Sequence, residues 1–352
     1  MPALPALSRT HNIAARRRLL HLFGAAALAP AALLSARAQA AGVDTLLNVS
    51  FDVSREYFRE INAAFIAQQQ QRTGQTLRVN MSHAGSSAQA RAVADGLDAD
   101  VVTMNTVTDI DFLAERGVVA RDWRQRLPHN AAPTTSTMLF LVRRGNPKGI
   151  RDWRDLIRPG VQVVVVNPKT GGNGRMAYLA AWGFVRSQGG SDADAAAFVR
   201  QLYQNVPVLA RGGRDATGVF LQRNIGDVLV TFESEVISVE SEFGVGRVDV
   251  VHPSTSLLTE NPVAIVERTV NQRGSRALAQ AYLEFLYSDA GQEIAASNHF
   301  RPRNPEVLRR HSQHLRPIRL FEVGQYFGSW GEAQRQHFAD GGQFDQIFAQ
   351  RR

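Results

Sequence analysis

The chain contains no cysteine among its 352 residues. Disulfide bonds, thiolate metal sites and a cysteine nucleophile are therefore excluded. After residue 40 the sequence also lacks an apolar run of membrane-spanning length, an internal repeat and a low-complexity segment. We therefore expect a soluble, folded chain that depends on its own hydrophobic core.

Acidic residues are absent from the first 40 positions, which have the layout of an export signal. Arg9 and Arg16–Arg18 form a basic region, Leu19–Leu34 is apolar and rich in alanine, and Ala38–Ala40 is a small-x-small cleavage site. The alternative is a buried N-terminal helix, which would place three arginines beside a core element. The pattern predicts that residues 1–40 are a signal peptide for the general or the twin-arginine route, and that the mature chain is periplasmic.

Removing this signal changes the meaning of the positive charge. It carries five of the 40 basic residues and none of the 32 acidic ones, so 35 basic residues remain and the net charge falls from +8 to +3. The remaining arginines are scattered among acids, without a basic run or an aromatic-basic stripe. The sequence thus argues against nucleic acid as a partner.

Short β-branched runs alternate with amphipathic stretches along the mature chain, which predicts α/β units with parallel strands and crossover helices. The expected strands are 46–51, 77–81, 100–104, 138–143, 161–166, 206–209, 227–232, 248–251 and 262–266. The expected helices begin at Ser54, at Ser86 or Ser87 and at Thr108, and then span 174–187, 192–203, 216–223 and 276–297.

The periodicity lapses between residues 124 and 136, where prolines and polar residues gather, so we place a hinge or domain crossing there. The expected organisation is a first lobe over 41–125, to which about 240–300 returns, and a second lobe over 126–239. Residues 301–352 would form a C-terminal helical clamp on the core.

Glycine and serine gather where predicted strands end, at Asp52–Ser54, His83–Ser87, Lys169–Gly174 and Gly212–Gly213. In open α/β sheets, ligands bind at the carboxyl ends of strands, where helix N-termini direct unpaired N–H groups outward. One such turn alone is more often ordinary turn geometry. Together they predict an anion pocket built from dipoles rather than full charges.

Six segments resemble the periplasmic sulfate- and thiosulfate-binding proteins of ABC transporters, and they extend over essentially the whole mature chain. They are Leu46–Ser50, Ser82–Ser86, Asn167–Thr170, Tyr178–Gly183, Ile225–Leu229 and His337–Gly342. The resemblance implies an α/β fold of the two-lobed periplasmic binding protein type (type II), hinged, with the ligand in the interlobe cleft. In that family, uncharged donors hold one dehydrated oxyanion: backbone N–H groups, serine hydroxyls and a tryptophan indole.

The resemblance also implies ligand contacts, position by position. These positions are Ser86, Gly171, Gly172, Asn173, Gly213 and Phe232. Gly171 lacks the hydroxyl of the family's serine, and Phe232 replaces its tryptophan and cannot donate a hydrogen bond. Each lost bond to a charged group is worth roughly 1.5–3 kcal/mol, so sulfate binding would weaken by a few orders of magnitude unless other donors compensate. The side-chain amide of Asn173 is one hypothetical replacement.

Three charged residues near these turns are expected to support the pocket without contacting the ligand. Asp52 is interpreted as a helix cap or a partner of Arg175 or Arg214, and the two arginines as residues that hold loops in place. A carboxylate inside the pocket would instead accept the proton of hydrogen phosphate and favour that ion over sulfate.

The sequence therefore predicts a monomeric receptor that captures inorganic sulfate or thiosulfate and delivers it to the permease subunits of an ABC transporter, without a cofactor or metal. A receptor for molybdate or phosphate remains open. A secreted hydrolase is the alternative from another class. It is disfavoured because His83 and Ser86 make no triad and no G-x-S-x-G or H-E-x-x-H motif is present, so no catalytic residues are expected.

Overall fold

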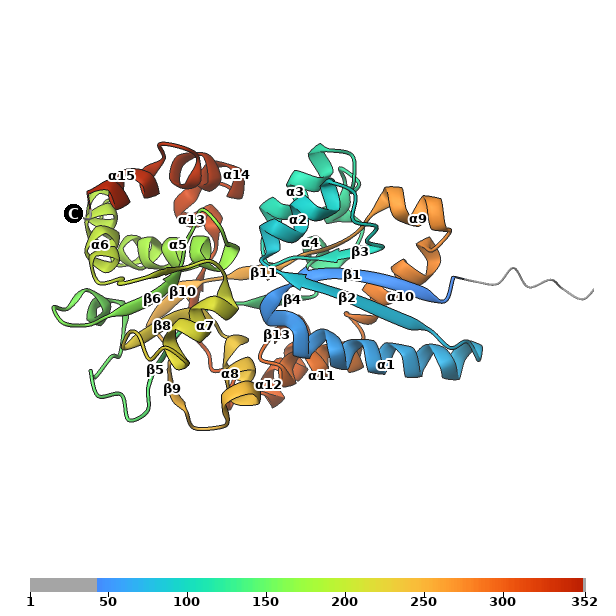
Figure 1. Cartoon of the computed structure of the whole chain (residues 1–352), viewed down its shortest axis with the longest axis horizontal. Helices are drawn as coiled ribbons and strands as arrows, with labels where there is room; N and C mark the ends of the chain where they lie inside the picture. Colours follow the sequence, from blue (N-terminus) through green and yellow to red (C-terminus); the bar gives the residue numbers. More distant parts are fainter. Residues whose placement is uncertain (1–42, 351–352) are drawn as a thin grey trace, which may run out of the picture. The chain divides into compact units, whose positions relative to one another are not determined.

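The computed structural model describes residues 43–350, which form two α/β lobes (Figure 1). The predicted signal peptide, residues 1–40, lies outside the described residues. Each lobe is built around its own sheet, and a third, smaller sheet lies in the segments that connect the two. No helix within 43–350 is both long and apolar enough to cross a membrane.

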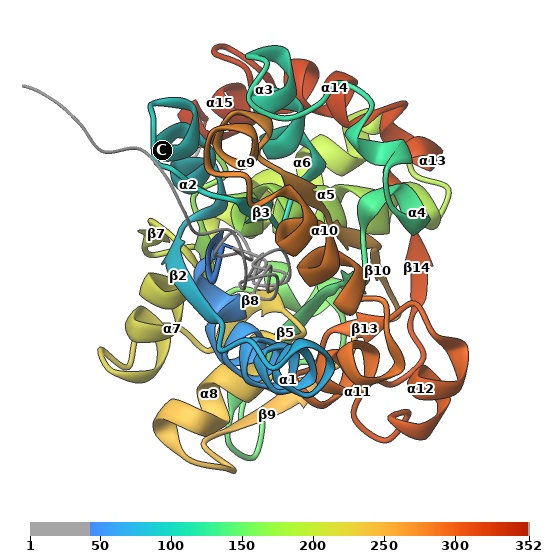
Figure 2. The same cartoon turned by 90° about the vertical axis from the view of Figure 1, so that its right-hand side faces the viewer.

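The first lobe contains a four-stranded sheet in the order β12-β3-β1-β2. Its strands are β1 (Thr45–Phe51), β2 (Arg78–Ala84), β3 (Val101–Thr103) and β12 (Val263–Ile265). β1 pairs in parallel with β2 and β3, whereas β12 is antiparallel to β3. The surrounding helices are α1 (Arg55–Thr73), α2 (Ser86–Ala94), α3 (Val107–Glu115), α9 (Glu267–Arg273) and α10 (Arg276–Phe285). In Figures 1 and 2, α2 and α3 lie on one side of this sheet and α1 on the other.

The second lobe contains a five-stranded sheet in the order β7-β6-β8-β5-β9. Its strands are β5 (Met138–Arg143), β6 (Val163–Val166), β7 (Leu209–Ala210), β8 (Val228–Phe232) and β9 (Val248–Val251). All four valines of β6 are buried, as predicted for a strand covered on both faces. The accompanying helices are α5 (Gly172–Ser187), α6 (Asp192–Gln204), α7 (Gly213–Leu221) and α8 (Glu235–Phe243).

A three-stranded antiparallel sheet lies where the chain passes between the lobes. Its central strand β4 (Thr134–Ser136) pairs with β11 (Thr259–Asn261) and β13 (Arg301–Pro302). From β13, Arg301 donates to both carboxylate oxygens of Glu233, at 2.7 and 2.9 Å, and both side chains are buried. Burial raises the pKa of Glu233 to about 7, and Arg301 opposes that rise. The predicted crossing at 124–136 thus contains an ordered strand with distant partners.

Histidines cluster beside this sheet, around α11 (Asp289–Ser297) and α12 (Pro305–Arg310). The ring of His299 stacks on that of His314 at 4.7 Å, and His311 meets His314 edge-on at 5.1 Å. His311 also hydrogen-bonds Glu293 at 2.8 Å. Burial and, to a lesser degree, the neighbouring histidines lower the pKa of His299 to about 4. The folded protein therefore resists protonation at this position.

The C-terminal segment packs on the second lobe. After β14 (Arg319–Phe321), which pairs with β10 (Thr255–Leu257), come α13 (Val323–Phe327), α14 (Trp330–Ala333), a π-helical turn (Gln334–Phe338) and α15 (Gln343–Ala349). Tyr178 of α5 hydrogen-bonds the His337 ring at 3.1 Å and makes ring contacts with Phe338 and Phe344. Figure 1 shows this red segment over α5 and α6.

Several predicted boundaries are wrong. The single helix expected over 276–297 is two helices, α10 and α11, because Ser288 leaves the helical conformation and its side chain accepts the N–H of Gly291 as an N-cap. The N-cap of α2 is Gly85, so Ser86 is its first helical residue and neither serine is the cap. The strand expected over 206–209 is confined to Leu209–Ala210. β9 pairs with β5 in the second lobe, so a return to the first lobe from about residue 240 is too early.

Candidate functional site

Three helices begin directly after strands or short turns at the facing ends of the two sheets. The first helical residues of α2, α5 and α7 are Ser86, Gly172 and Gly213, and each N-cap is a glycine without a capping side chain. The first N–H groups of a helix have no intrahelical acceptor, and the helix dipole favours an anion there. Each of these three termini can therefore donate to a ligand.

Asn105, two residues after β3, brings two of these termini together. Its backbone N–H donates to Ser86 Oγ at 3.3 Å. Its side-chain Oδ1 lies against Gly172, because a Cβ added at Gly172 would be only 2.5 Å from it. The first turns of α2 and α5, from different lobes, thus lie on either side of Asn105.

The third terminus, that of α7, meets α5 and the end of β1. A Cβ added at Gly213 would lie 2.9 Å from Val53 Cγ1 and 3.8 Å from both Asn173 Nδ2 and Asp52 Oδ1. Asn173 is the second residue of α5, and its Nδ2 donates to Thr231 Oγ1 at 3.0 Å. The structure therefore brings together the predicted residues Ser86, Gly172, Asn173 and Gly213.

Gly171 and Phe232 contribute little to this arrangement. The N–H of Gly171 is bonded to the carbonyl of Asn167 at 3.1 Å, and a Cβ there would lie 2.9 Å from Val166 Cγ1. Phe232 is 2% exposed, belongs to the hydrophobic core and pairs with Met138 in the sheet. The N–H of Gly171 is therefore used within its own turn, and the side chain of Phe232 packs in the hydrophobic core.

Asp52 caps the N-terminus of α7 from the other lobe. Its Oδ2 accepts the backbone N–H of Arg214 at 3.3 Å, and its Oδ1 accepts the N–H of Val53 at 3.0 Å. Burial raises the pKa of Asp52, and these donors oppose that rise. Of the predicted roles, capping fits the geometry, whereas pairing with Arg175 does not. The guanidinium of Arg214 instead pairs with Glu242 at 2.6 Å.

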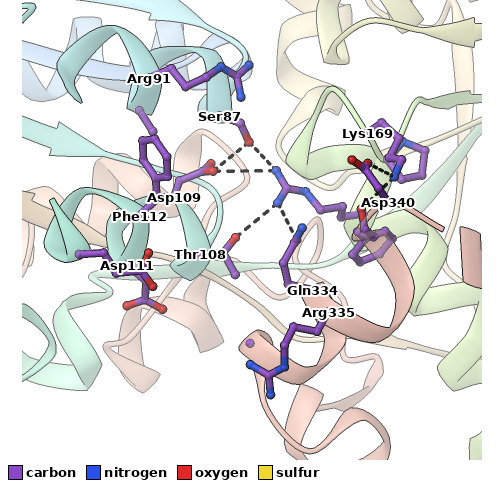
Figure 3. A pocket seen from close by; sticks show the side chains of 16 residues that line it. Ser87, Arg91, Thr108, Asp109, Asp111, Phe112, Lys169, Gln334, Arg335 and Asp340 are labelled. Carbon is purple, nitrogen blue, oxygen red and sulfur yellow. Dashed lines mark hydrogen bonds and ion pairs between the residues drawn. The ribbon is translucent and has the colours of Figure 1, made fainter. Parts of the chain in front are cut away.

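Arg175 connects the lobes beside the helix termini, through Ser87, Thr108 and Gln334, which Figure 3 labels. From α5 it hydrogen-bonds Ser87 of α2, Thr108 of α3 at 3.5 Å and Gln334 of the C-terminal segment at 3.1 Å. It lies along a cavity of about 610 Å³ whose other lining residues carry both signs of charge, including Asp109 and Lys169. This cavity does not match the predicted pocket of uncharged donors. Arg175 links α5 to α2, α3 and the C-terminal segment along it.

Three buried polar residues near the termini were missed at the sequence level: Asn105, Thr231 and Glu235. Glu235 begins α8, and one carboxyl oxygen accepts the hydroxyl of Thr217 at 2.5 Å while the other has no partner. Burial raises its pKa to about 8. The position of Asn105 directly after the predicted strand 100–104 is a signal that could have identified it.

His83, the residue considered for a hydrolase, contacts the end of β1. Its Nδ1 hydrogen-bonds the carbonyl of Phe51 at 3.2 Å, and burial lowers its pKa. The Oγ of Ser86 contacts Met104 Sδ and the N–H of Asn105. Neither side chain has the other as a hydrogen-bond partner, so the pair has no nucleophile-base geometry.

Comparison with known proteins matches residues 51–301 to a family described as bacterial extracellular solute-binding protein. The chain is 52% identical to the thiosulfate-binding protein of Pseudomonas aeruginosa over 93% of this chain and 98% of that protein. It is 47% identical to the sulfate-binding protein of Escherichia coli over 90% and 96%. Among solved structures it resembles the sulfate-binding protein SubI from Mycobacterium tuberculosis, with 32% identity, a TM-score of 0.76, and coverage of 84% of this chain and 99% of that one.

Proposed function

Because the chain belongs to the bacterial extracellular solute-binding protein family, we propose that it is a periplasmic receptor that captures sulfate or thiosulfate and delivers it to the permease of an ABC importer. It is a binding protein and not an enzyme. The observation that carries the proposal is the meeting of three helix N-termini from two lobes at one place.

The proposed ligand contacts are backbone N–H groups of Ser86, Gly172, Asn173 and Gly213, together with the Ser86 hydroxyl. Sulfate at neutral pH offers only acceptors, so donors alone satisfy it. Hydrogen phosphate would bring an O–H that needs an acceptor, and leaving it unpaired is costly. The carboxylate of Asp52 is already engaged by two backbone N–H groups, which leaves it less available for that proton.

We also propose that the three-stranded sheet of β4, β11 and β13 is the hinge about which the lobes close. The strands of this sheet lie in the segments that join the two larger sheets. Opening about it would separate Ser86 of one lobe from Gly172 and Gly213 of the other, and closure would return them to the positions seen here. The first lobe would comprise residues up to about 130 and those after β9 that reach β12, with residues 1–40 removed on export.

Isothermal titration of residues 41–352 against sulfate, thiosulfate, molybdate and phosphate tests the proposal. We expect one site per chain, with sulfate or thiosulfate bound at least tenfold more tightly than phosphate, the equivalent of about 1.4 kcal/mol. Absence of binding to sulfate and thiosulfate, or tighter binding of phosphate, would contradict it. Hydrolysis of a sulfate ester would instead support the alternative that the protein is a secreted hydrolase.

A further inference from the structure

Two asparagines at the N-terminus of α5 each carry an oxygen without a hydrogen-bond partner. Asn105 and Asn173 are both 4% exposed, and the Oδ1 of each is buried and unpaired. A buried unpaired polar atom costs roughly 1–3 kcal/mol. Both atoms lie at one helix terminus, so the cost falls where unpaired helix N–H groups also meet. A fully deprotonated oxyanion offers only acceptors, so it can satisfy an asparagine here only if the amide turns its N–H end toward the ligand.

In either orientation, the Asn173 amide has one end without a hydrogen-bond partner within the protein. Its Nδ2 now donates to Thr231 Oγ1, which leaves Oδ1 unpaired. A threonine hydroxyl can accept or donate, so exchanging the two ends of the amide lets Thr231 donate to Oδ1 and frees Nδ2. After this exchange Oδ1 occupies the end of the amide that faces Thr231 and lies 3.8 Å from the Cβ position of Gly213. Nδ2 then occupies the other end, which is buried and has no partner within the protein, on the second residue of α5. At that position Nδ2 needs an acceptor.

We propose that Asn173 is a specificity-determining ligand contact, whose side-chain amide N–H donates to the bound oxyanion, and that Thr231 is a positioning residue that holds the amide in this orientation. The inference rests on the proposed function and refines it. A donating amide adds to the preference for a fully deprotonated tetrahedral oxyanion. It also supplies one of the side-chain donors that Gly171 and Phe232 do not provide.

Two substitutions at Asn173 test whether its side chain donates a hydrogen bond to the ligand. We expect Asn173→Ala to weaken sulfate binding roughly 10- to 100-fold, as for a lost hydrogen bond to a charged group. Asn173→Asp keeps the shape but offers only acceptors, so we expect it to lose more affinity than the alanine variant. Unchanged affinity in Asn173→Ala would overturn the proposal. A carboxylate facing the ligand would accept the O–H of hydrogen phosphate, so we also expect Asn173→Asp to shift the preference from sulfate toward phosphate. An unchanged ratio of sulfate to phosphate affinity in this variant would likewise overturn the proposal.

The role of Thr231 is tested by two further variants and a control. Thr231→Val removes the hydroxyl at constant shape, and we expect roughly 3- to 10-fold weaker binding, restored in Thr231→Ser. Thr137→Val is the matched control, since Thr137 is equally buried and its hydroxyl has no partner. Melting of each variant without ligand shows that it is folded. Equal affinity of Thr231→Val and the control would refute the positioning role.

These measurements distinguish a failure of the proposed side-chain contact from a failure of the proposed function. If the unmodified protein binds none of the four anions, the proposed function fails. If it binds sulfate or thiosulfate and the Asn173 and Thr231 variants bind them equally well, the receptor stands and only the side-chain contact is wrong.

Discussion

An alanine at Gly172 would act as a wedge between the lobes. Its Cβ would lie 2.5 Å from Asn105 Oδ1 and 2.8 Å from Thr106 Cγ2, both closer than real Cβ contacts. Asn105 and Thr106 follow β3 in the first lobe, whereas Gly172 begins α5 in the second. The backbone at Gly172 is helical, so alanine itself fits the helix. The strain therefore arises only where the two lobes meet.

The size of the effect follows from this contact. Overpacking a tightly packed region costs typically about 1–3 kcal/mol. If that cost applies to the closed form alone, sulfate affinity falls roughly 5- to 150-fold. We expect Gly172→Ala to show this loss in isothermal titration, while its melting temperature without sulfate stays within a few degrees of the unmodified protein.

Gly218→Ala is the matched control for this wedge. It lies within α7, and its Cβ would meet only the end of the Gln222 side chain, at 3.5 Å. We expect it to bind sulfate like the unmodified protein and to melt slightly higher, because alanine is the better helix residue. Unaltered affinity in Gly172→Ala, or an equal loss in the control, would refute the reasoning.

Three further predictions concern the lobe contacts and the buried charges. Arg175→Met removes hydrogen bonds from α5 to both the first lobe and the C-terminal segment, so we expect roughly tenfold faster sulfate release in stopped-flow measurements. Arg301→Met leaves Glu233 buried without its partner, and we expect a loss of about 3–5 kcal/mol in denaturant unfolding, partly recovered by adding Glu233→Gln. The lowered pKa of His299 means that the unfolded chain binds more protons between pH 6.5 and about 4, so this residue destabilises the fold as the pH falls through that window. His299→Asn tolerates the positive φ of 58° and should gain melting temperature relative to the unmodified protein from pH 6.5 to 4.5; a constant difference would contradict this.

Most of the two large sheets could be predicted from the sequence because their strands are encoded locally. Val163–Val166 and Val228–Phe232 are continuous β-branched or apolar runs, and both are fully buried. The ends of two other predicted strands, 77–81 and 206–209, indicated the regions where Ser86 and Gly213 lie. Local pattern is sufficient here because burial on both faces requires apolar residues at every position.

The smaller sheet could not be predicted in this way. β4 has three residues, and its partners lie more than 120 positions further along the chain. No local periodicity marks such short strands, since their pairing depends on the fold around them. The break at Ser288 was hidden for a related reason, because apolar spacing continues on both sides of the cap.

The site was predictable at the level of the backbone and less so for side chains. Glycine at strand ends correctly indicated helix termini, but it did not show that the N–H of Gly171 is used within its own turn. Thr231 lies inside a strand, where the sequence gives no reason to separate it from core residues. Its importance depends on the side chain of Asn173, which only the folded chain brings to it.

Each lobe is completed by a segment that comes much later in the sequence than its first strands. The first sheet is completed by Val263–Ile265, which pairs with β3, and the second lobe by the rings of His337, Phe338 and Phe344 against Tyr178. The first sheet therefore lacks a strand until residue 265 has been made, and the second lobe cannot complete its interior until nearly the whole polypeptide has been made. A nascent chain of this design therefore stays incomplete until the residues of its C-terminal segment are available.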